Sequence, residues 1–189
     1  MDKTHPVLSI FSGLPGVGKS TLASALALHI GATYLRVDAI EQALKDVYQT
    51  DIFDEGYQLA FRIATDNLKL DLSVIGDSCN SVSESRTAWQ QVATDLDMLF
   101  VNIEVICSNK FAHQHRIETR QSTVQNLTLP TWQHVQEREY QPWDQKVTRL
   151  DTANKTVQQS IDDCNLLLSK FINKSVGITS NLRRKHTFA

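Results

Sequence analysis

The feature that most limits what this chain can fold into is the stretch at residues 13–20, Gly-Leu-Pro-Gly-Val-Gly-Lys-Ser. It matches the phosphate-loop pattern G-x-x-x-x-G-K-[ST] at every fixed position. Its glycines let the backbone turn tightly and point amide N–H groups at an anion. A lysine then supplies charge for the outer phosphates, and a serine hydroxyl can bind Mg²⁺. We expect nucleotide phosphates to contact Gly13, Pro15, Gly16, Val17, Gly18, Lys19, Ser20 and Thr21.

The segments on either side of the loop provide the context that the pattern needs. Residues 7–11 form a short apolar run that predicts a buried strand, and residues 21–30 are rich in helix-forming residues. A helix that begins at the loop directs its positive dipole end at the same phosphates. The alternative is a glycine-rich turn without a ligand, but strand, loop and helix in this order favour the binding loop.

Composition sets the class of protein. The chain has 189 residues, 41% of them hydrophobic and 21% charged, which predicts a single globular domain. The formal net charge of -2 argues against a general nucleic-acid-binding surface, although a local basic site stays open. Three cysteines without metal-like spacing favour reduced structural thiols. We see no signal peptide and no membrane span, and we expect a cytoplasmic protein.

Predicted strands alternate with predicted helices along the chain. We expect strands at residues 7–11, 33–38, 73–77, 98–106 and 147–151. We expect helices at residues 21–30, 39–48, 54–70, 83–96, 109–121, 131–140 and 155–172. This order predicts an α/β fold with a parallel sheet and helices on both faces, and a ligand at the carboxyl ends of the strands. The phosphate loop, Asp38, Asp77, the region of Asn109 and Asp151 should meet at that edge.

Two aspartates at strand ends are the candidate metal and catalytic residues. Asp77 should lie beside Ser20 and support Mg²⁺, although it could instead cap a turn. Asp38 could accept the proton of a substrate hydroxyl during phosphoryl transfer. Its alternative role is to cap the helix that follows, and both roles are compatible.

Two arginines on one predicted helix are candidates for a lid over the phosphates. Arg116 and Arg120 are four residues apart, so they share a helical face and could clamp phosphates. The alternative is a solvated basic face that includes Glu118. Residues 173–189 should form a basic, flexible tail.

Taken in order, these elements resemble a known group of enzymes. They are G-x-P-G-x-G-K-S, Asp38, Asp77-Ser78-Cys79-Asn80, His115-Arg116-Ile117-Glu118-Thr119-Arg120 and Arg138-Glu139-Tyr140-x-Pro142-Trp143. Over residues 7–172 the chain resembles the small phosphate-loop kinases related to the kinase domain of polynucleotide kinase, chloramphenicol phosphotransferase and zeta toxins.

The resemblance implies a three-layer P-loop NTPase fold with a five-stranded parallel sheet of order 2-3-1-4-5. It implies a kinase domain at residues 1–172 with a helical lid around residues 109–125. The substrates would be ATP, used with Mg²⁺, and a small molecule that carries a hydroxyl. By matching position, Lys19 and Ser20 would bind phosphate and Mg²⁺, Asp38 would be the general base, and Asp77 would support the metal. Arg116 and Arg120 would be lid arginines, and Arg86 would lie near the substrate or the phosphates.

One departure from the family bears on the acceptor. In polynucleotide kinases an arginine three residues after the base helps to bind a substrate phosphate, and here that position is Glu41. We interpret this as favouring a neutral or cationic acceptor.

Three functions stay open: a small-molecule kinase, a nucleotide or polynucleotide 5′-hydroxyl kinase, and an ATP-binding regulatory module with slow hydrolysis and no acceptor. A GTPase is disfavoured by two absences. The guanine-binding motif Asn-Lys-x-Asp would need an aspartate where Ala112 stands, and the switch motif Asp-x-x-Gly, starting at Asp77, would need a glycine where Asn80 stands.

Overall fold

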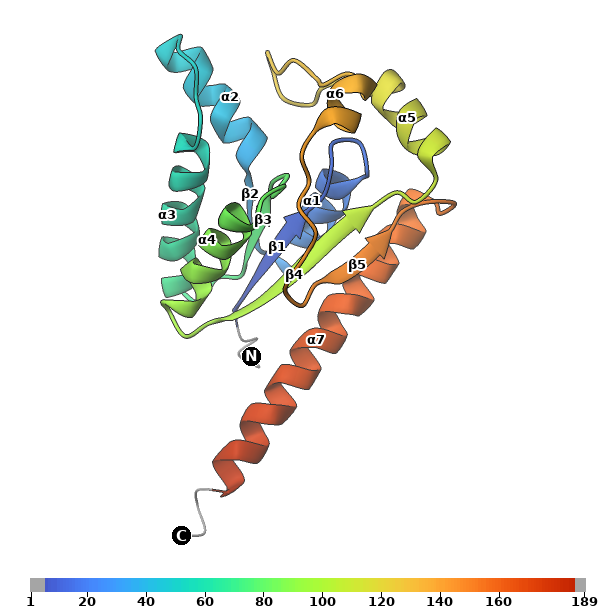
Figure 1. The fold of residues 1–189 in the computed structure, drawn as a ribbon. Helices are drawn as coiled ribbons and strands as arrows, with labels where there is room; N and C mark the ends of the chain where they lie inside the picture. Colours follow the sequence, from blue (N-terminus) through green and yellow to red (C-terminus); the bar gives the residue numbers. More distant parts are fainter. Residues whose placement is uncertain (1–5, 186–189) are drawn as a thin grey trace.

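The core of the protein is a five-stranded parallel sheet. The computed structural model describes the backbone of residues 6–185 and the side chains as far as residue 175. The strands are β1 (Val7–Ser12), β2 (Thr33–Arg36), β3 (Val74–Asp77), β4 (Leu99–Ile106) and β5 (Thr148–Asp151). They pair in the order β2-β3-β1-β4-β5, which confirms the expected topology (Figure 1).

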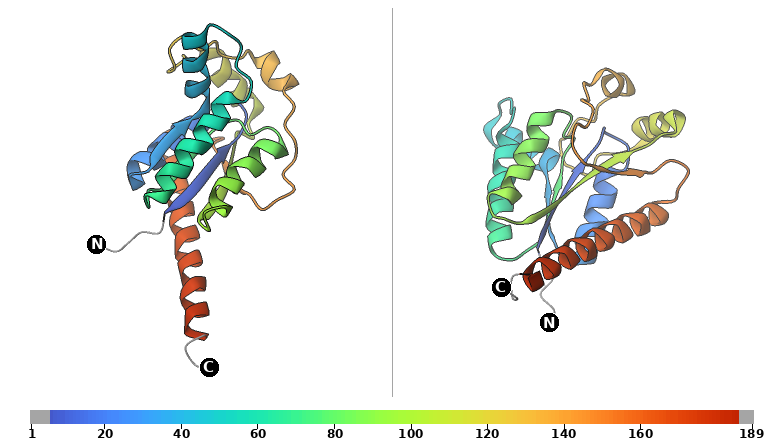
Figure 2. Two further views of the ribbon diagram at one scale, coloured as in Figure 1. Left: turned by 90° about the vertical axis from the view of Figure 1, so that its left-hand side faces the viewer. Right: turned by 60° about the horizontal axis from the view of Figure 1, so that its bottom comes forward.

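Helices cover both faces of this sheet. Seven are present in the described residues: α1 (Lys19–Ile30), α2 (Val37–Tyr48), α3 (Glu55–Lys69), α4 (Ser83–Thr94), α5 (Lys110–Thr119), α6 (Trp132–Glu137) and α7 (Val157–Lys185). α1 and α7 pack on one face, and α3 and α4 pack on the other (Figure 2). None of the helices within this part of the chain has the length and apolar character that a membrane span requires.

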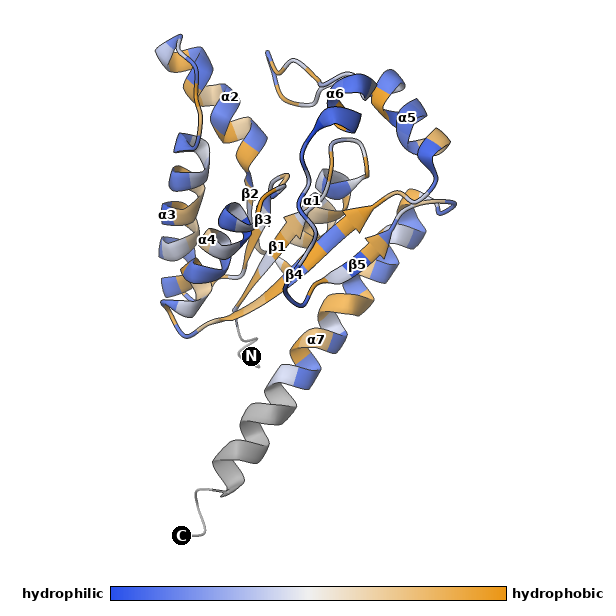
Figure 3. Cartoon of the chain, viewed as in Figure 1, coloured by the Kyte–Doolittle hydropathy of each residue, from blue (hydrophilic) through white to orange (hydrophobic). Residues whose placement is uncertain are grey.

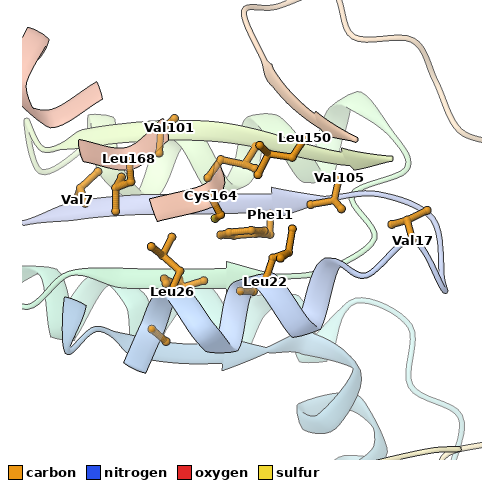
Figure 4. Packing of buried hydrophobic residues seen from close by; sticks show 14 residues of the cluster. Val7, Phe11, Val17, Leu22, Leu26, Val101, Val105, Leu150, Cys164 and Leu168 are labelled. Atoms are coloured by element: carbon orange, nitrogen blue, oxygen red, sulfur yellow. The ribbon is translucent and has the colours of Figure 1, made fainter. Parts of the chain in front are cut away.

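Each face of the sheet has its own hydrophobic core. All six residues of β1 are buried, as expected for a central parallel strand that is covered on both sides. On one face Phe11 packs with Leu22, Leu26 and Cys164, and Figure 4 shows these side chains between the sheet and the helices. On the other face Trp89 lies at the centre of the second cluster. The strands are correspondingly apolar and the outer helix faces polar (Figure 3).

Several boundaries differ from the sequence prediction, and two of them move candidate residues. β2 ends at Arg36, so Asp38 lies in the first turn of α2 rather than at the end of a strand. α5 ends at Thr119, and Arg120 follows it in an extended conformation. α7 continues to Lys185, so most of the expected tail is helical; residues 186–189 lie outside the described residues.

The carboxyl ends of the strands form one edge of the sheet. The phosphate loop, α2, α5 and α6 all lie at this edge (Figure 1). Here the fold brings together segments that are far apart in the sequence.

Candidate active site

The phosphate loop connects β1 to α1, and its backbone conformation requires glycine. Gly13 has φ +143° and Gly16 has φ +82°, a range that other residues rarely adopt. A Cβ on Gly13 would lie 2.3 Å from the carbonyl oxygen of Val105, so the loop packs directly on the end of β4. The Gly13 amide also donates a hydrogen bond to the carbonyl of Cys79, at 3.1 Å, which ties the loop to the segment after β3.

Lys19 and Asp77 form a buried ion pair beneath the loop. The Lys19 Nζ lies 2.5 Å from the Asp77 carboxylate, and the side chains are 8% and 0% exposed. Burial alone would lower the pKa of Lys19, but the carboxylates of Asp77 and Asp38 outweigh it and raise that pKa. For Asp77, burial is outweighed by the charge of Lys19, so the pKa of the carboxyl is lowered. Both groups are therefore charged at neutral pH.

Tyr34 is the second partner of Asp77. Its hydroxyl donates to the other carboxylate oxygen at 2.6 Å, and burial together with the Asp77 charge raises the pKa of the phenol. The sequence analysis did not select Tyr34, because a tyrosine in a short strand is an ordinary packing residue.

Asp38 and Glu41 lie on α2, three residues apart, and both line the main cavity of the site. Burial and the neighbouring Asp38 charge raise the pKa of Glu41 to about 7. Glu41 therefore holds its proton to a higher pH than an ordinary glutamate does.

The two lid arginines have different surroundings. Arg116 donates to the side-chain and main-chain oxygens of Thr152, at 2.8 and 3.1 Å. Thr152 in turn donates to the carbonyl of Val17, so this contact joins α5, the phosphate loop and the residue after β5. Arg120 makes no such bond in the described residues and lies near Asp38 and Arg36. Arg120 is the C-cap of α5, and its amide still donates to the Arg116 carbonyl at 3.1 Å, so the two arginines keep the expected spacing of one helical turn and both line the cavity.

α5 rests on the phosphate loop. A Cβ on Gly16 would lie 2.4 Å from the Ile117 Cδ1, so this helix packs on the loop at its closest point. The His113 Nε2 donates to the carbonyl of Pro15 at 2.7 Å, since a carbonyl can only accept. Trp132 of α6 packs edge-on against the His113 ring, with 5.1 Å between the ring centres. The expected lid region is thus in contact with the phosphate loop through side chains.

A cavity of about 910 Å³ unites these groups. Of the predicted residues, it is lined by Pro15, Gly16, Gly18, Lys19, Ser20, Thr21, Asp38, Arg116 and Arg120. The other three predicted residues do not line it: Gly13 and Val17 belong to the loop itself, and Asp77 is buried beneath it. The cavity has further lining residues that the sequence does not single out, among them Tyr34 and Arg36, and Thr152 at the end of β5 lines it as well. Cys79 and Arg138, which belong to the motifs of the family resemblance, also line it.

Arg86 does not lie near the substrate cavity, contrary to the expectation from the family resemblance. Its side chain is 2% exposed and donates hydrogen bonds to the carbonyls of Asn80, Ser81, Gln141 and Pro142. Its guanidinium also lies over the rings of Tyr140 and Trp143. Arg86 therefore fixes the segment between α6 and β5 against α4.

The residues at the loop fit a nucleotide and Mg²⁺. The loop presents backbone N–H groups at the start of α1, with Lys19 beside them, which is a site for phosphates. Within the described residues no group of three or more His, Cys, Asp or Glu side chains could hold a metal alone. Mg²⁺ needs only one or two protein oxygens when phosphates and water complete its shell, and the Ser20 hydroxyl in the cavity offers one. The two Asp77 oxygens are bonded to Lys19 and Tyr34, so Asp77 would support the metal from behind Ser20.

A family model described as an AAA domain (AAA_33) matches residues 8–142, more than half of the chain. No curated protein matches the sequence. Among solved structures, one is a Chloroflexus aurantiacus protein provisionally assigned as a kinase, with TM-score 0.69 and 19% identity, covering 87% of this chain and 98% of that one.

Two other solved structures carry more specific names. A gluconokinase from Sinorhizobium meliloti has TM-score 0.64 and 13% identity, covering 91% of this chain and 97% of that one. The Mycobacterium tuberculosis APS kinase CysC, in complex with AMPPNP and APS, has TM-score 0.58 and 18% identity, covering 86% and 98%. At these identities the likenesses establish the fold.

Proposed function

Since the chain belongs to the AAA_33 family of small P-loop kinases, we propose that it transfers the γ-phosphoryl group of ATP to a hydroxyl of a small molecule, with Mg²⁺. The observation that carries the proposal is that Asp38, Lys19 and Arg120 line one cavity together with the phosphate loop. A candidate base therefore lines the same cavity as the phosphate-binding groups. The names of the gluconokinase and the APS kinase support a small-molecule acceptor.

In the proposed reaction, Asp38 accepts the proton of the acceptor hydroxyl. The oxygen then forms a bond to the γ-phosphorus, and the bond from that phosphorus to the β–γ bridging oxygen breaks, so ADP leaves. Because transfer spreads negative charge over the moving phosphoryl group, Lys19 and Arg120 stabilise it electrostatically. Arg116 positions the nucleotide side of the cavity through its bonds to Thr152.

Ser20 and Asp77 would hold Mg²⁺, which would neutralise phosphate charge when bound. Tyr34 orients the Asp77 carboxylate through its hydrogen bond. Residues 121–130, which follow α5 and contribute to the cavity wall, would limit access of water to the reacting groups.

The test is ATP consumption in the presence of a panel of hydroxyl compounds: nucleosides, 5′-hydroxyl oligonucleotides, sugars, sugar acids and aminoglycosides. Wild type should be stimulated by one class of small molecule, and Asp38→Asn should lose this stimulation while still binding ATP. Asp66→Asn, an exposed aspartate on α3 outside the cavity, is the matched control and should behave as wild type.

Two results would overturn the proposal. Stimulation by oligonucleotides alone would favour the polynucleotide kinase. Equal slow hydrolysis in wild type and Asp38→Asn, with no response to any acceptor, would favour the regulatory module.

A further inference from the structure

The acceptor side of the cavity carries more positive charge than the sequence indicated. Arg36, Arg120 and Arg138 line the same cavity as the carboxylates of Asp38 and Glu41. Among the residues whose side chains are described, no ion pair joins any of these arginines to a carboxylate. The sequence interpretation rested on Glu41 and did not include Arg36.

Arg36 and Arg120 form a pair of like charges. Burial lowers the pKa of the Arg120 guanidinium, the Asp38 carboxylate opposes this shift, and the nearby Arg36 adds to it. The Nε atom of each arginine is buried and makes no hydrogen bond in the described part of the chain. Two partly buried cations that lie near each other are unfavourable unless an anion joins them.

The carboxylates of the protein do not supply that anion. The elevated pKa of Glu41 leaves it only partly charged at neutral pH, since burial and Asp38 both favour its protonated form. Asp38 is one charge against two guanidinium groups, and Arg138 adds a third on the same cavity.

The surrounding chain holds Arg36 in place beneath the segment that follows α5. The Arg36 Nη1 donates to the Thr123 hydroxyl at 2.8 Å. A second bond, from Asn126 to Asp46 at 3.0 Å, joins the same segment to α2. A ligand at Arg36 would therefore lie between α2 and residues 120–130, apart from the Arg116–Thr152 contact at the end of β5.

We infer that the acceptor is an alcohol that also carries an anionic group, a carboxylate or a phosphate monoester, and that Arg36 and Arg120 bind this group. The inference rests on the proposed function. It assigns the hydroxyl to Asp38 and the anion to the two guanidinium groups, which can bind carboxylate or phosphate through paired N–H donors. Arg120, with five N–H donors, would contact this anion as well as the transferred phosphoryl group. It replaces the sequence interpretation of a neutral or cationic acceptor.

The activity test compares acceptors with one carbon skeleton: glucitol, gluconate and glucitol 6-phosphate. We expect an anionic member to be preferred, and which one it is separates carboxylate from phosphate. Arg36→Gln should raise the KM for that acceptor about tenfold or more, with the KM for ATP unchanged, because a hydrogen bond to a charged group is lost. Arg62→Gln, an exposed arginine on α3 outside the cavity, is the matched control. Preference for glucitol, or an equal effect of Arg36→Gln on all three, would overturn the inference.

A binding test decides the question even if no acceptor is phosphorylated. Calorimetry with sulfate, in the presence of saturating Mg²⁺ and AMPPNP to occupy the phosphate loop, should detect binding to wild type. Arg36→Gln and Arg120→Gln should each weaken it about tenfold or more, and Arg62→Gln should not. No sulfate binding, or equal binding by all four proteins, would refute the anion site. Sulfate binding without any phosphoryl transfer would instead count against the proposed kinase and leave the anion site supported.

Discussion

The contact between Gly16 and α5 leads to a quantitative prediction about the phosphate loop. In Gly16→Ala the new Cβ would lie 2.4 Å from the Ile117 Cδ1 and 2.8 Å from its Cγ1, at a residue with φ +82°. The positive φ costs about 1–2 kcal/mol for a residue with a Cβ. The overlap adds about 1–3 kcal/mol, because the buried Ile117 must move. We expect a total loss of about 2–5 kcal/mol.

Gly31→Ala is the matched control for the cost of placing a Cβ on a residue with positive φ. Gly31 ends α1 with φ +66°, and no atom lies within 4 Å of a Cβ built there. Its substitution should therefore cost only about 1–2 kcal/mol. The difference between the two alanine variants measures the packing of α5 on the loop.

Urea unfolding of a double-mutant cycle with Ile117→Val provides the assay. The valine lacks the Cδ1 atom, so the cost of Gly16→Ala should fall by about 1 kcal/mol in this background. The reasoning is refuted if Gly16→Ala costs no more than Gly31→Ala, or if Ile117→Val leaves its cost unchanged.

Three further predictions follow from individual side chains. The pKa of Glu41 is raised from 4.5 to about 7, so the folded state binds this proton more tightly than the unfolded state. The free energy of unfolding should therefore fall as pH rises from about 4.5 to about 7. In urea unfolding measured over this pH range, Glu41→Gln should abolish the fall. Tyr34→Phe removes the 2.6 Å hydrogen bond to Asp77, so it should lower kcat about tenfold and raise the Mg²⁺ concentration needed for half-maximal activity. A Mg²⁺ titration of activity measures this, and an unchanged Mg²⁺ concentration would count against a role for Tyr34. Arg86→Met leaves four carbonyls without their donor and should destabilise the fold by about 3 kcal/mol or more, with Arg86→Lys recovering only part of the loss.

The sequence predicted those parts of the site that depend on local residues. The phosphate loop is a contiguous motif, and its conformation depends on the glycines at fixed spacing. Asp38 and Asp77 were found because they follow apolar runs that end at the same edge of a parallel sheet. The strand order itself came from the family resemblance, since alternation of strands and helices leaves several orders open.

The residues that were missed owe their position to tertiary contacts. Arg36 is two residues from Asp38, but nothing in the sequence shows that Thr123 would bind it from the segment after α5. Arg86 was misplaced because its role was transferred from the family resemblance, whereas here backbone carbonyls and two aromatic rings surround it. The i, i+4 spacing of Arg116 and Arg120 did place both on the cavity, because the Arg120 amide still bonds to the Arg116 carbonyl at the end of α5.

The most direct test of the central claim follows the radiolabelled γ-phosphoryl group of ATP. With wild type and the preferred acceptor, the label should appear in an organic phosphate ester, and Asp38→Asn should lose about two to four orders of magnitude in this transfer, the usual contribution of a general base. Label recovered only as inorganic phosphate, at the same rate in both proteins, would contradict the account, because water would then be the acceptor and Asp38 would have no part in the reaction.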